Sequence, residues 1–165
     1  MNNRELAVSV RDADPDRDLS AIIALNRCIQ DIHVAVEPSI FRRSDDMPGI
    51  EDFHLGFLRD EGRYTVVAEV GTDLVGYVSL ELQTRPAHTF ANAQDRLYVH
   101  QVDVHPGHRR HGVGRALMSW VDALATELGV SEVSLDTCLF NADALNFFES
   151  LGYSTYNLRL RKTGL

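Results

Sequence analysis

The residues of this chain that are best suited to chemistry lie between His105 and Arg115, where three arginines and three histidines occur without a single acid. Gly112 and Gly114 in this stretch stand where an apolar helical pattern over 113–128 begins. The first turn of a helix has backbone N–H groups without partners, and the helix dipole makes that end positive. Glycine has no Cβ, so an anion has room near these amides. The stretch therefore predicts a phosphate or pyrophosphate site, with a solvated basic loop as the competing interpretation.

Other interpretations of this stretch are weaker. A Walker-type loop is excluded because no Gly-Lys-Ser/Thr follows, and a dinucleotide fingerprint lacks its third glycine, which is Leu117 here. His105, His108 and His111 could form a metal cluster, but they lie across a Pro-Gly turn and have no cysteine or paired carboxylate beside them. We therefore expect no metal, and a metal-binding protein built on these histidines ranks as the third alternative.

Length and composition favour a single domain over residues 1–165, because 44% of the 165 residues are apolar and 24% are charged. A net charge of −8 speaks against a nucleic-acid partner. No apolar run approaches the roughly 20 residues of a membrane span, and the first residues lack the apolar core of a secretory signal. With only two cysteines, the chain is expected to be cytoplasmic, without a membrane partner and without a structural disulfide.

Hydrophobic periodicity and turn residues divide the chain into alternating strands and helices. Strands are expected at 6–11, 63–70, 74–82, 97–105, 132–138 and 153–162, and helices at 14–36, 50–58, 113–128 and 141–151. Asp14 followed by Pro15 is a helix start, and a polar loop is expected over 83–96. This order indicates an α+β or mixed-sheet protein and not a doubly wound sheet.

Two stretches together resemble one family. The sequence RRHGVG at 109–114 resembles the acyl-CoA pyrophosphate loop of the GNAT acetyltransferase superfamily, and NADALNFFESLGY at 141–153 is similar to the last block of that family. Both occur in the family's order and at its usual separation, and the resemblance covers about 63–160. It implies a GNAT-like α+β fold: a central mixed, mostly antiparallel twisted sheet with a splayed strand pair and about four flanking helices. It also implies an acetyl-CoA-dependent N-acetyltransferase acting on a primary amine.

The resemblance implies where acetyl-CoA binds. The pantetheine arm would meet the backbone of the strand that ends before the loop, at Val102, Asp103 and Val104. The pyrophosphate would lie at the loop, which comprises Arg109, Arg110, His111, Gly112, Val113, Gly114 and Arg115. Asn141 and Phe148 would contribute from the last helix. Core packing by Val102 and Val104, and simple helix capping by Asn141, stay open beside these roles.

A base is needed because a free primary amine, with a pKa near 10, is mostly protonated at pH 7. His100 is the first candidate, two residues after Tyr98 and on the same strand face. These two positions match two histidines of the aromatic-amine acetyltransferases of the superfamily. Asp136 matches by position the base carboxylate of enzymes that acetylate ribosomal-protein N-termini, and Glu81 is a third candidate. A packed, hydrogen-bonded histidine is the alternative for His100.

The chain departs from the family at Phe148, where most members have a tyrosine that protonates the leaving thiolate. Tyr98, Tyr153 or water could supply that proton, or the thiolate could leave unassisted, since thiols have a pKa near 8.5. We expect a modest loss of rate. The departure keeps a second function open, a non-catalytic acyl-CoA-binding sensor or regulatory module of the same fold.

The acceptor pocket of this family is built from the first two helices and the hairpin. Residues 1–61 carry thirteen acids and seven bases, so we expect a cationic amine acceptor, with ordinary solvated acids as the alternative. Asp31, His33 and Glu37 are candidates for its rim. A second copy of the chain is left open as a partner.

Overall fold

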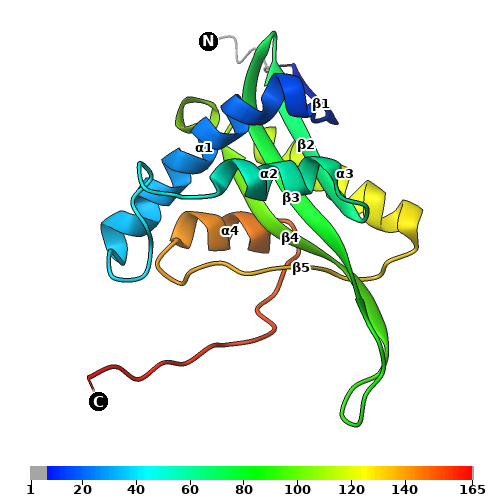
Figure 1. Cartoon of the computed structure of the whole chain (residues 1–165). Helices are drawn as coiled ribbons and strands as arrows, with labels where there is room; N and C mark the ends of the chain where they lie inside the picture. The colour runs from blue at the N-terminus through cyan, green and yellow to red at the C-terminus, as the bar shows by residue number, and fades with distance from the viewer. Residues whose placement is uncertain (1–6, 165) are drawn as a thin grey trace.

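The computed structural model describes residues 7–164 and contains one five-stranded sheet with helices on both of its faces (Figure 1). In chain order the elements are β1 (Val8–Asp12), α1 (Pro15–Val36), α2 (Ile50–Arg59), β2 (Arg63–Val70), β3 (Asp73–Arg85), β4 (Gln94–Val104), a short 3-10 helix (Pro106–His108), α3 (Val113–Leu128), β5 (Val133–Leu135) and α4 (Ala142–Ser150). The order confirms the predicted α+β class.

The sheet is mixed and mostly antiparallel, as predicted. Its strands lie in the order β1-β2-β3-β4-β5, and only β4 and β5 are parallel. Only Leu97–Val99 of β4 pairs with β5, so the rest of β4 toward its C-terminal end has no partner on that side. This divergence is the splayed pair that the sequence predicted.

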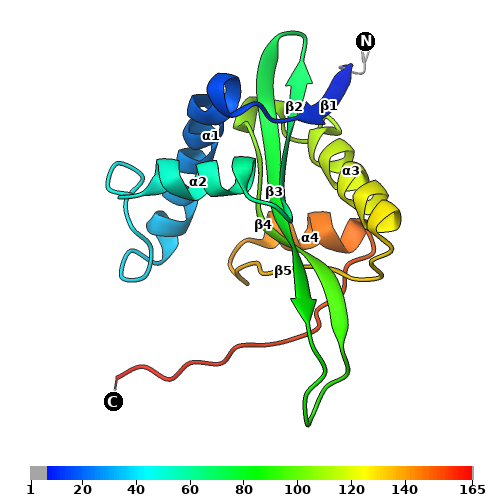
Figure 2. The ribbon, with the colours of Figure 1, turned by 45° about the vertical axis from the view of Figure 1, so that its right-hand side comes forward.

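Apolar side chains form a layer on each face of the sheet. Figure 2 shows α1 and α2 on one face and α3 on the other. The larger layer packs Leu97 and Val99 of β4 against Leu117 and Met118 of α3, all of them buried. The smaller layer, under α1, comprises Ile22, Leu25, Val67 and Tyr77. Burial of each such aliphatic side chain stabilises the fold by about 1.5–3 kcal/mol.

The start of α1 is fixed by side chains that the sequence indicates. Asp14 accepts hydrogen bonds from the N–H groups of Asp16, at 2.8 Å, and Arg17, at 3.2 Å. Asp18 accepts two hydrogen bonds from the Arg11 guanidinium of β1, at 2.6 and 2.9 Å. The Arg11 hydrogen bonds lower the pKa of the Asp18 carboxyl. The first turn of α1 is therefore tied to the edge strand of the sheet.

The hairpin of β3 and β4 is longer than predicted, so the expected polar loop over 83–96 is wrong in extent. The register pairs Gln83 with Arg96 and Arg85 with Gln94, which leaves only 86–93 as the connection. Arg96 Nε donates to Gln83 Oε1 at 2.9 Å across the pair. Polar cross-strand pairs therefore continue the ladder beyond the apolar part of each strand.

Two predicted strands near the C-terminus are corrected. The strand expected at 132–138 is limited to Val133–Leu135, because its only partner bends away after Val99. The strand expected at 153–162 is not formed: this segment has no regular secondary structure, and Leu158 and Leu160 on it are exposed. The strand expected at 6–11 is observed as Val8–Asp12, and its first predicted residue lies outside the described residues.

Among the described residues, α1 is long and apolar enough by composition to cross a membrane, which differs from the expectation that no such run exists. Core helices of folded domains can have the same length and apolar composition. Ile22 and Leu25 of α1 are buried against the sheet, and its first turn carries Asp16 and Asp18. These contacts are those of a helix that covers a sheet.

Candidate active site

A β-bulge in β4 organises the candidate site. Val99 pairs with Leu80 and Gln101 pairs with Ser79, which leaves His100 as the extra residue between two regular stretches of ladder. As a result, two consecutive residues, His100 and Gln101, lie on the sheet face that carries α1 and α2. The apolar residues on either side of the bulge stay on the α3 face.

His100 lies beside Glu81 of β3. Its Nε2 is buried and lies 3.0 Å from Glu81 Oε1, within ion-pair distance although the N–H does not meet hydrogen-bond geometry. Gln83 donates to the same carboxylate at 2.7 Å, and this bond together with His100 lowers the pKa of Glu81. Arg63 Nε lies 3.4 Å from its other oxygen. The ring of Phe57 lies 4.9 Å from that of His100. An ionised carboxylate and an aromatic ring therefore orient the imidazole.

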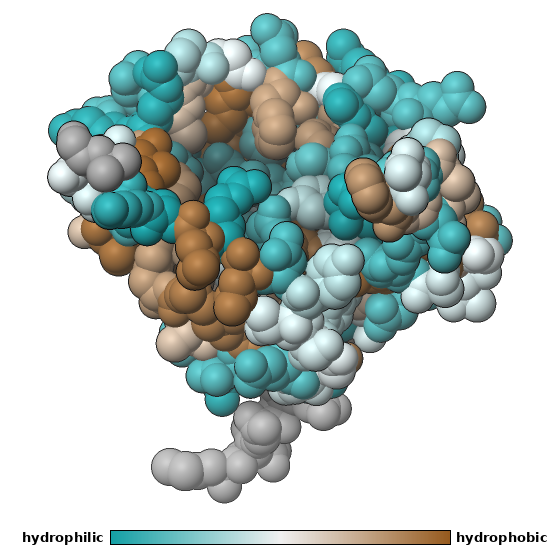
Figure 3. Space-filling model, turned by 90° about the horizontal axis from the view of Figure 1, so that it is seen from below, coloured by the Kyte–Doolittle hydropathy of each residue, from teal (hydrophilic) through white to brown (hydrophobic). Residues whose placement is uncertain are grey.

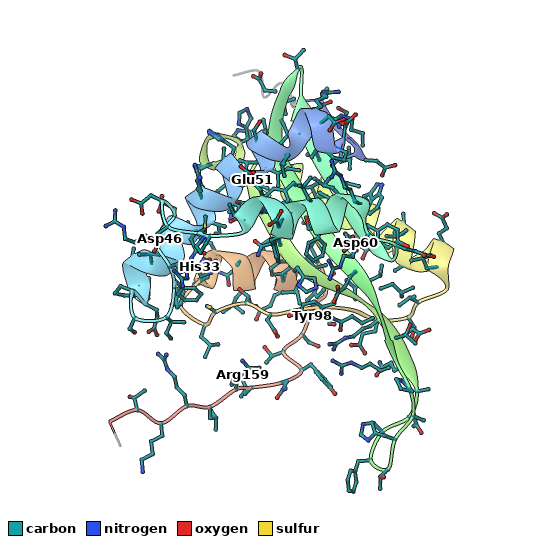
Figure 4. The ribbon with its side chains drawn as sticks, viewed as in Figure 1. His33, Asp46, Glu51, Asp60, Tyr98 and Arg159 are labelled. Carbon is teal, nitrogen blue, oxygen red and sulfur yellow. The ribbon has the colours of Figure 1, made fainter. Side chains whose placement is uncertain are left out.

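Tyr98 and Asp136 also meet. The Tyr98 hydroxyl donates to Asp136 Oδ2 at 2.7 Å, which ties β4 to the segment after β5. Burial and this carboxylate raise the pKa of Tyr98 to about 12, so the phenol stays protonated at neutral pH. The rings of Tyr98 and His100 are 4.7 Å apart. Figure 4 shows Tyr98 on the sheet and Arg159 on the C-terminal segment, and the charge of Arg159 acts on this phenol in the opposite direction. The four predicted catalytic residues therefore form two adjacent pairs.

The predicted anion site is the start of α3. The first intrahelical bond runs from Ala116 N–H to Gly112 O, so the N–H groups of Val113, Gly114 and Arg115 come before it. Gly112 has a φ of 85°, and a Cβ built there meets nothing within 4 Å. The loop thus offers free amides at the positive end of a 16-residue helix, with Arg115 in its first turn.

Gly114 also lies close to α4. A Cβ at this position would lie 3.0 Å from Cζ of Phe147, so a larger residue would require the Phe147 ring to shift. Arg110 has a φ of 66°, which a non-glycine residue adopts only at a cost. His111 Nδ1 contacts the carbonyl of Arg109 at 2.8 Å, and Arg109 Nε donates to the carbonyl of Val104 at 3.1 Å. The loop backbone therefore determines where Arg109 and Arg110 are placed.

The open side of β4 faces this loop. His105 N–H donates to Val75 O, so the alternation of an antiparallel ladder directs the peptide groups of Asp103 toward β3 as well. The same alternation directs the peptide groups of Val102 and Val104 away from β3, toward the gap beside β5. The Asp103 carboxyl is buried, and burial raises its pKa to about 7. Two of the three predicted backbone positions thus face the gap.

The predicted residues of α4 have structural roles. Asn141 Oδ1 accepts from Ala144 N–H at 3.2 Å and caps the helix. Phe148 is buried in the larger apolar layer, and its ring lies 5.6 Å from that of Tyr153. Burial raises the pKa of Tyr153 to about 12, and its hydroxyl has no hydrogen-bond partner among the described residues.

The rim residues of the predicted acceptor side lie near the end of α1. The ring of His33 lies 4.8 Å from Phe41, and its Nδ1 contacts Ile29 O at 2.9 Å. Glu37 accepts a hydrogen bond of 2.5 Å from Arg161 of the C-terminal segment. Asp31 is exposed. Within residues 7–164, no group of three His, Cys, Asp or Glu side chains is placed to hold a metal, and Cys28 and Cys138 are free.

Sequence reasoning missed a polar cluster under α1 and α2. His54 of α2 is 1% exposed, and neither ring nitrogen has a hydrogen-bond partner within residues 7–164, so desolvation lowers its pKa to about 4. Asn26 of α1 donates to Tyr77 Oη at 3.1 Å and to Gln101 Oε1 at 2.9 Å. The available signal was weak: each of these residues is a single polar position within an apolar helical or strand pattern.

Comparison with known proteins gives the family. A sequence model of the acetyltransferase (GNAT) family matches residues 28–153. Streptothricin acetyltransferase from Streptomyces lavendulae is 27% identical over 94 residues, which are 57% of this chain and 46% of that protein. N-acetyltransferase 8 from Homo sapiens is 30% identical over 104 residues, 63% of this chain and 44% of that protein. The matches thus span less than half the length of these two relatives.

Solved structures share the fold over almost the whole chain. A variant of the BH1408 protein from Bacillus halodurans superposes with a TM-score of 0.88 at 20% identity, covering 94% of this chain and 99% of that one. An aminoglycoside N-acetyltransferase in complex with CoA superposes with a TM-score of 0.75 at 15% identity, covering 99% of each chain. The family match covers most of the chain, and the splayed sheet agrees with it, so the protein belongs to the acetyltransferase (GNAT) family.

Proposed function

We propose that this protein transfers an acetyl group from acetyl-CoA directly to a primary amine of a small molecule or peptide, within a ternary complex. The observation that carries the proposal is the His100–Glu81 pair, placed by a bulge where β4 turns away from β5. The family uses acetyl-CoA, and a fold neighbour has been solved with CoA. The proposal treats residues 1–165 as one catalytic domain.

Acetyl-CoA, the acetyl donor, fits the gap between β4 and β5 and the loop before α3. The free amides of Val113, Gly114 and Arg115 are suited to a pyrophosphate, with charge added by Arg109 and Arg110. The peptide groups of Val102 and Val104 would meet the pantetheine amides along the unpaired edge of β4. His111, Gly112 and Asp103 shape the loop and strand, and Asn141 and Phe148 support the helix that closes the far side. No metal is assigned a role.

His100 is proposed as the base. Acetyl-CoA supplies the acetyl thioester, whose carbonyl carbon an uncharged amine attacks. His100 removes the proton that the amine must lose, and Glu81, 3.0 Å from Nε2, stabilises the positive charge that the imidazole then gains. Nitrogen-to-carbon bond formation is followed by cleavage of the carbon–sulfur bond, and the thiolate leaves with the electron pair. The protonated phenol of Tyr98, whose ring lies 4.7 Å from the imidazole ring, is proposed to supply a proton to that thiolate. Asp136, which holds that phenol, is thereby a positioning residue.

A cationic acceptor is proposed for the α1 side. The acidic balance of residues 1–61 supports it, as does the Arg161 guanidinium that Glu37 binds within the chain itself. An acid near the C-terminal end of α1 opposes the helix dipole, so Glu37 stands where stability alone would not favour it. Glu37, Asp31 and His33 are proposed as rim groups for a polyamine, an aminoglycoside or a peptide amine.

We also propose that the protein is cytoplasmic and that it forms a homodimer. Figure 3 shows apolar side chains among polar ones on the face seen from below. Tyr156, Leu158 and Leu160 of the C-terminal segment are 93%, 64% and 90% exposed. Such alternating apolar side chains on an extended segment support pairing with a second copy of the chain.

The experiment follows thiol release from acetyl-CoA over a panel of cationic, neutral and anionic amines, with CoA binding measured by calorimetry. We expect CoA binding that Arg109→Glu with Arg110→Glu abolishes, and turnover that is fastest with polycationic amines. Preference for neutral or anionic amines would overturn the acceptor assignment. CoA binding without turnover on any amine would favour the alternative of a non-catalytic sensor, which the absence of a tyrosine hydroxyl at Phe148 keeps open.

A further inference from the structure

Asn26 connects three elements beneath the candidate site. It lies on α1, is 8% exposed, and reaches both β3 and β4. Its Nδ2 donates one hydrogen to Tyr77 Oη at 3.1 Å and the other to Gln101 Oε1 at 2.9 Å. Both hydrogens of one amide nitrogen are therefore committed to acceptors on two neighbouring strands.

The surroundings make these bonds costly to lose. Tyr77 is fully buried, and Ile22 and Leu25 of α1 pack beside it. Water does not replace a missing donor at Tyr77, so this hydroxyl left without its partner costs about 1–3 kcal/mol, whereas Gln101 is half-buried. The side-chain amide of Asn26 therefore has one favourable orientation, and in this orientation it binds the side chain of Gln101.

Gln101 is the residue directly after the bulge. A bulge admits alternative positions along a strand, because moving the extra residue by one place changes which side chains point to each face. With the extra residue placed between Val99 and Gln101, His100 and Gln101 both lie on the α1 and α2 face. The bond from Asn26 fixes Gln101 on this face, and so fixes His100 beside Glu81 at 3.0 Å.

We propose that Asn26 is a positioning residue that locks the bulge in β4 and thereby sets the place of His100. The hydrogen bonds of the Asn26 side chain among the described residues go to Gln101 and Tyr77, and Asn26 acts through them. The inference rests on the proposed function of His100 for its catalytic consequence, but its structural part concerns the bulge alone.

The test compares Asn26→Leu with Val121→Ala. Val121 lies on α3 and is fully buried in the larger apolar layer, on the opposite face of the sheet from Asn26. We expect Asn26→Leu to lower kcat by about 10- to 100-fold with the KM for acetyl-CoA changed less than about 2-fold, since a displacement near 1 Å has effects of this size. Val121→Ala should also lose stability, because truncation of a buried aliphatic side chain leaves a cavity, and it should keep kcat.

The variant Gln101→Leu provides a second test. If Asn26 acts through Gln101, each single variant and the double variant lose the same factor in kcat, because the second change removes an interaction already absent. Multiplicative losses in the double variant, or an equal kcat loss in Val121→Ala, would overturn the proposal.

A third measurement separates this inference from the proposed function. In the wild-type chain, the ring-proton NMR shifts of His100 should respond to Glu81→Gln, and in the Asn26→Leu background this response should disappear. Persistence of the response would refute the positioning role even if the protein shows no turnover with any amine. Loss of the response in a protein without turnover would keep the bulge lock and refute the catalytic role of His100.

Discussion

The two faces of β4 present different kinds of side chain, apolar on one face and polar on the other. Toward α3 the strand presents apolar side chains that pack in the larger layer, namely Leu97, Val99, Val102 and Val104. Toward α1 and α2 it presents groups that bond or titrate, namely Tyr98, His100, Gln101 and Asp103. The bulge allows both, because the extra residue is added to the polar face while the apolar residues keep their places. The comparison indicates that stability and chemistry can be changed separately on this strand.

The largest effect is expected at His100. His100→Gln removes the proposed base and should lower kcat by about 10²- to 10⁴-fold, with the free energy of unfolding changed by less than about 1 kcal/mol. Steady-state kinetics and urea unfolding would be measured on the same preparations. His88→Gln, in the exposed hairpin loop, is the control and should leave both quantities unchanged. A kcat loss below tenfold would show that His100 is a packing residue.

Leu97→Ala tests the opposite face of the same strand. Leu97 is fully buried, and truncation of a buried leucine to alanine costs about 2–5 kcal/mol. Chemical denaturation should show this loss, while kcat per folded molecule stays near the wild-type value. A large drop in kcat at temperatures where the variant is fully folded would contradict the separation of the two faces.

His54 gives the polar side a pH-dependent stability. Its folded-state pKa is about 4, below the ordinary value near 6.5, so between these values the unfolded chain binds a proton that the folded chain does not. Stability contributed by this group is therefore lost as pH falls from about 6.5 to about 4, by about 3 kcal/mol in total. The raised pKa of Asp103, about 7, acts in the opposite direction over the whole of this window, since the folded chain then holds the extra proton on that carboxyl.

The measurement is accordingly a difference between two proteins. Urea unfolding of wild type and His54→Leu at a series of pH values should show a gap that shifts in favour of the variant as the pH falls through this window. Parallel curves for the two proteins would show that His54 does not stay neutral in the folded state.

The smallest effect is expected at Phe148, on the apolar side. Phe148→Tyr introduces a hydroxyl that can protonate the leaving thiolate, and we expect kcat to rise by no more than about tenfold, because a thiolate leaves without strong assistance. Burial of the new hydroxyl should cost about 1–3 kcal/mol of stability. Turnover slower than that of the wild type, measured per folded molecule, would contradict the expectation that the missing hydroxyl at position 148 costs the wild type a modest loss of rate.

Local signals in the sequence predicted most elements. Asp14 with Pro15 placed the start of α1, and the apolar spacing over 113–128 gave the bounds of α3 as observed. The loop and the last helix were identified from two short blocks. What depends on partners far along the chain was not predicted well. The length of β5 is set by where β4 bends. The segment after Tyr153 carries a strand pattern but pairs with no strand among the described residues.

The candidate site shows the same division. His100, Glu81, Tyr98 and Asp136 could be chosen by residue type and strand position, but their pairing into two contacts requires the register of three strands. Asn26 and His54 could not be singled out, because a lone polar residue in an apolar helix has no signature of its own. For Gly114 the sequence suggested room for an anion, and the structure adds a second constraint, the ring of Phe147 from 33 positions later in the chain.

The bulge has a consequence for how such a protein changes over time. If codon 100 were deleted, the remaining residues from Leu97 to Val104 would alternate strictly between the two sheet faces, as in an ordinary strand. The packed layer would be untouched, and only the imidazole would be gone. A single in-frame insertion or deletion is therefore enough to convert an inert scaffold of this fold into a candidate catalyst, or the reverse, with no repacking of its interior.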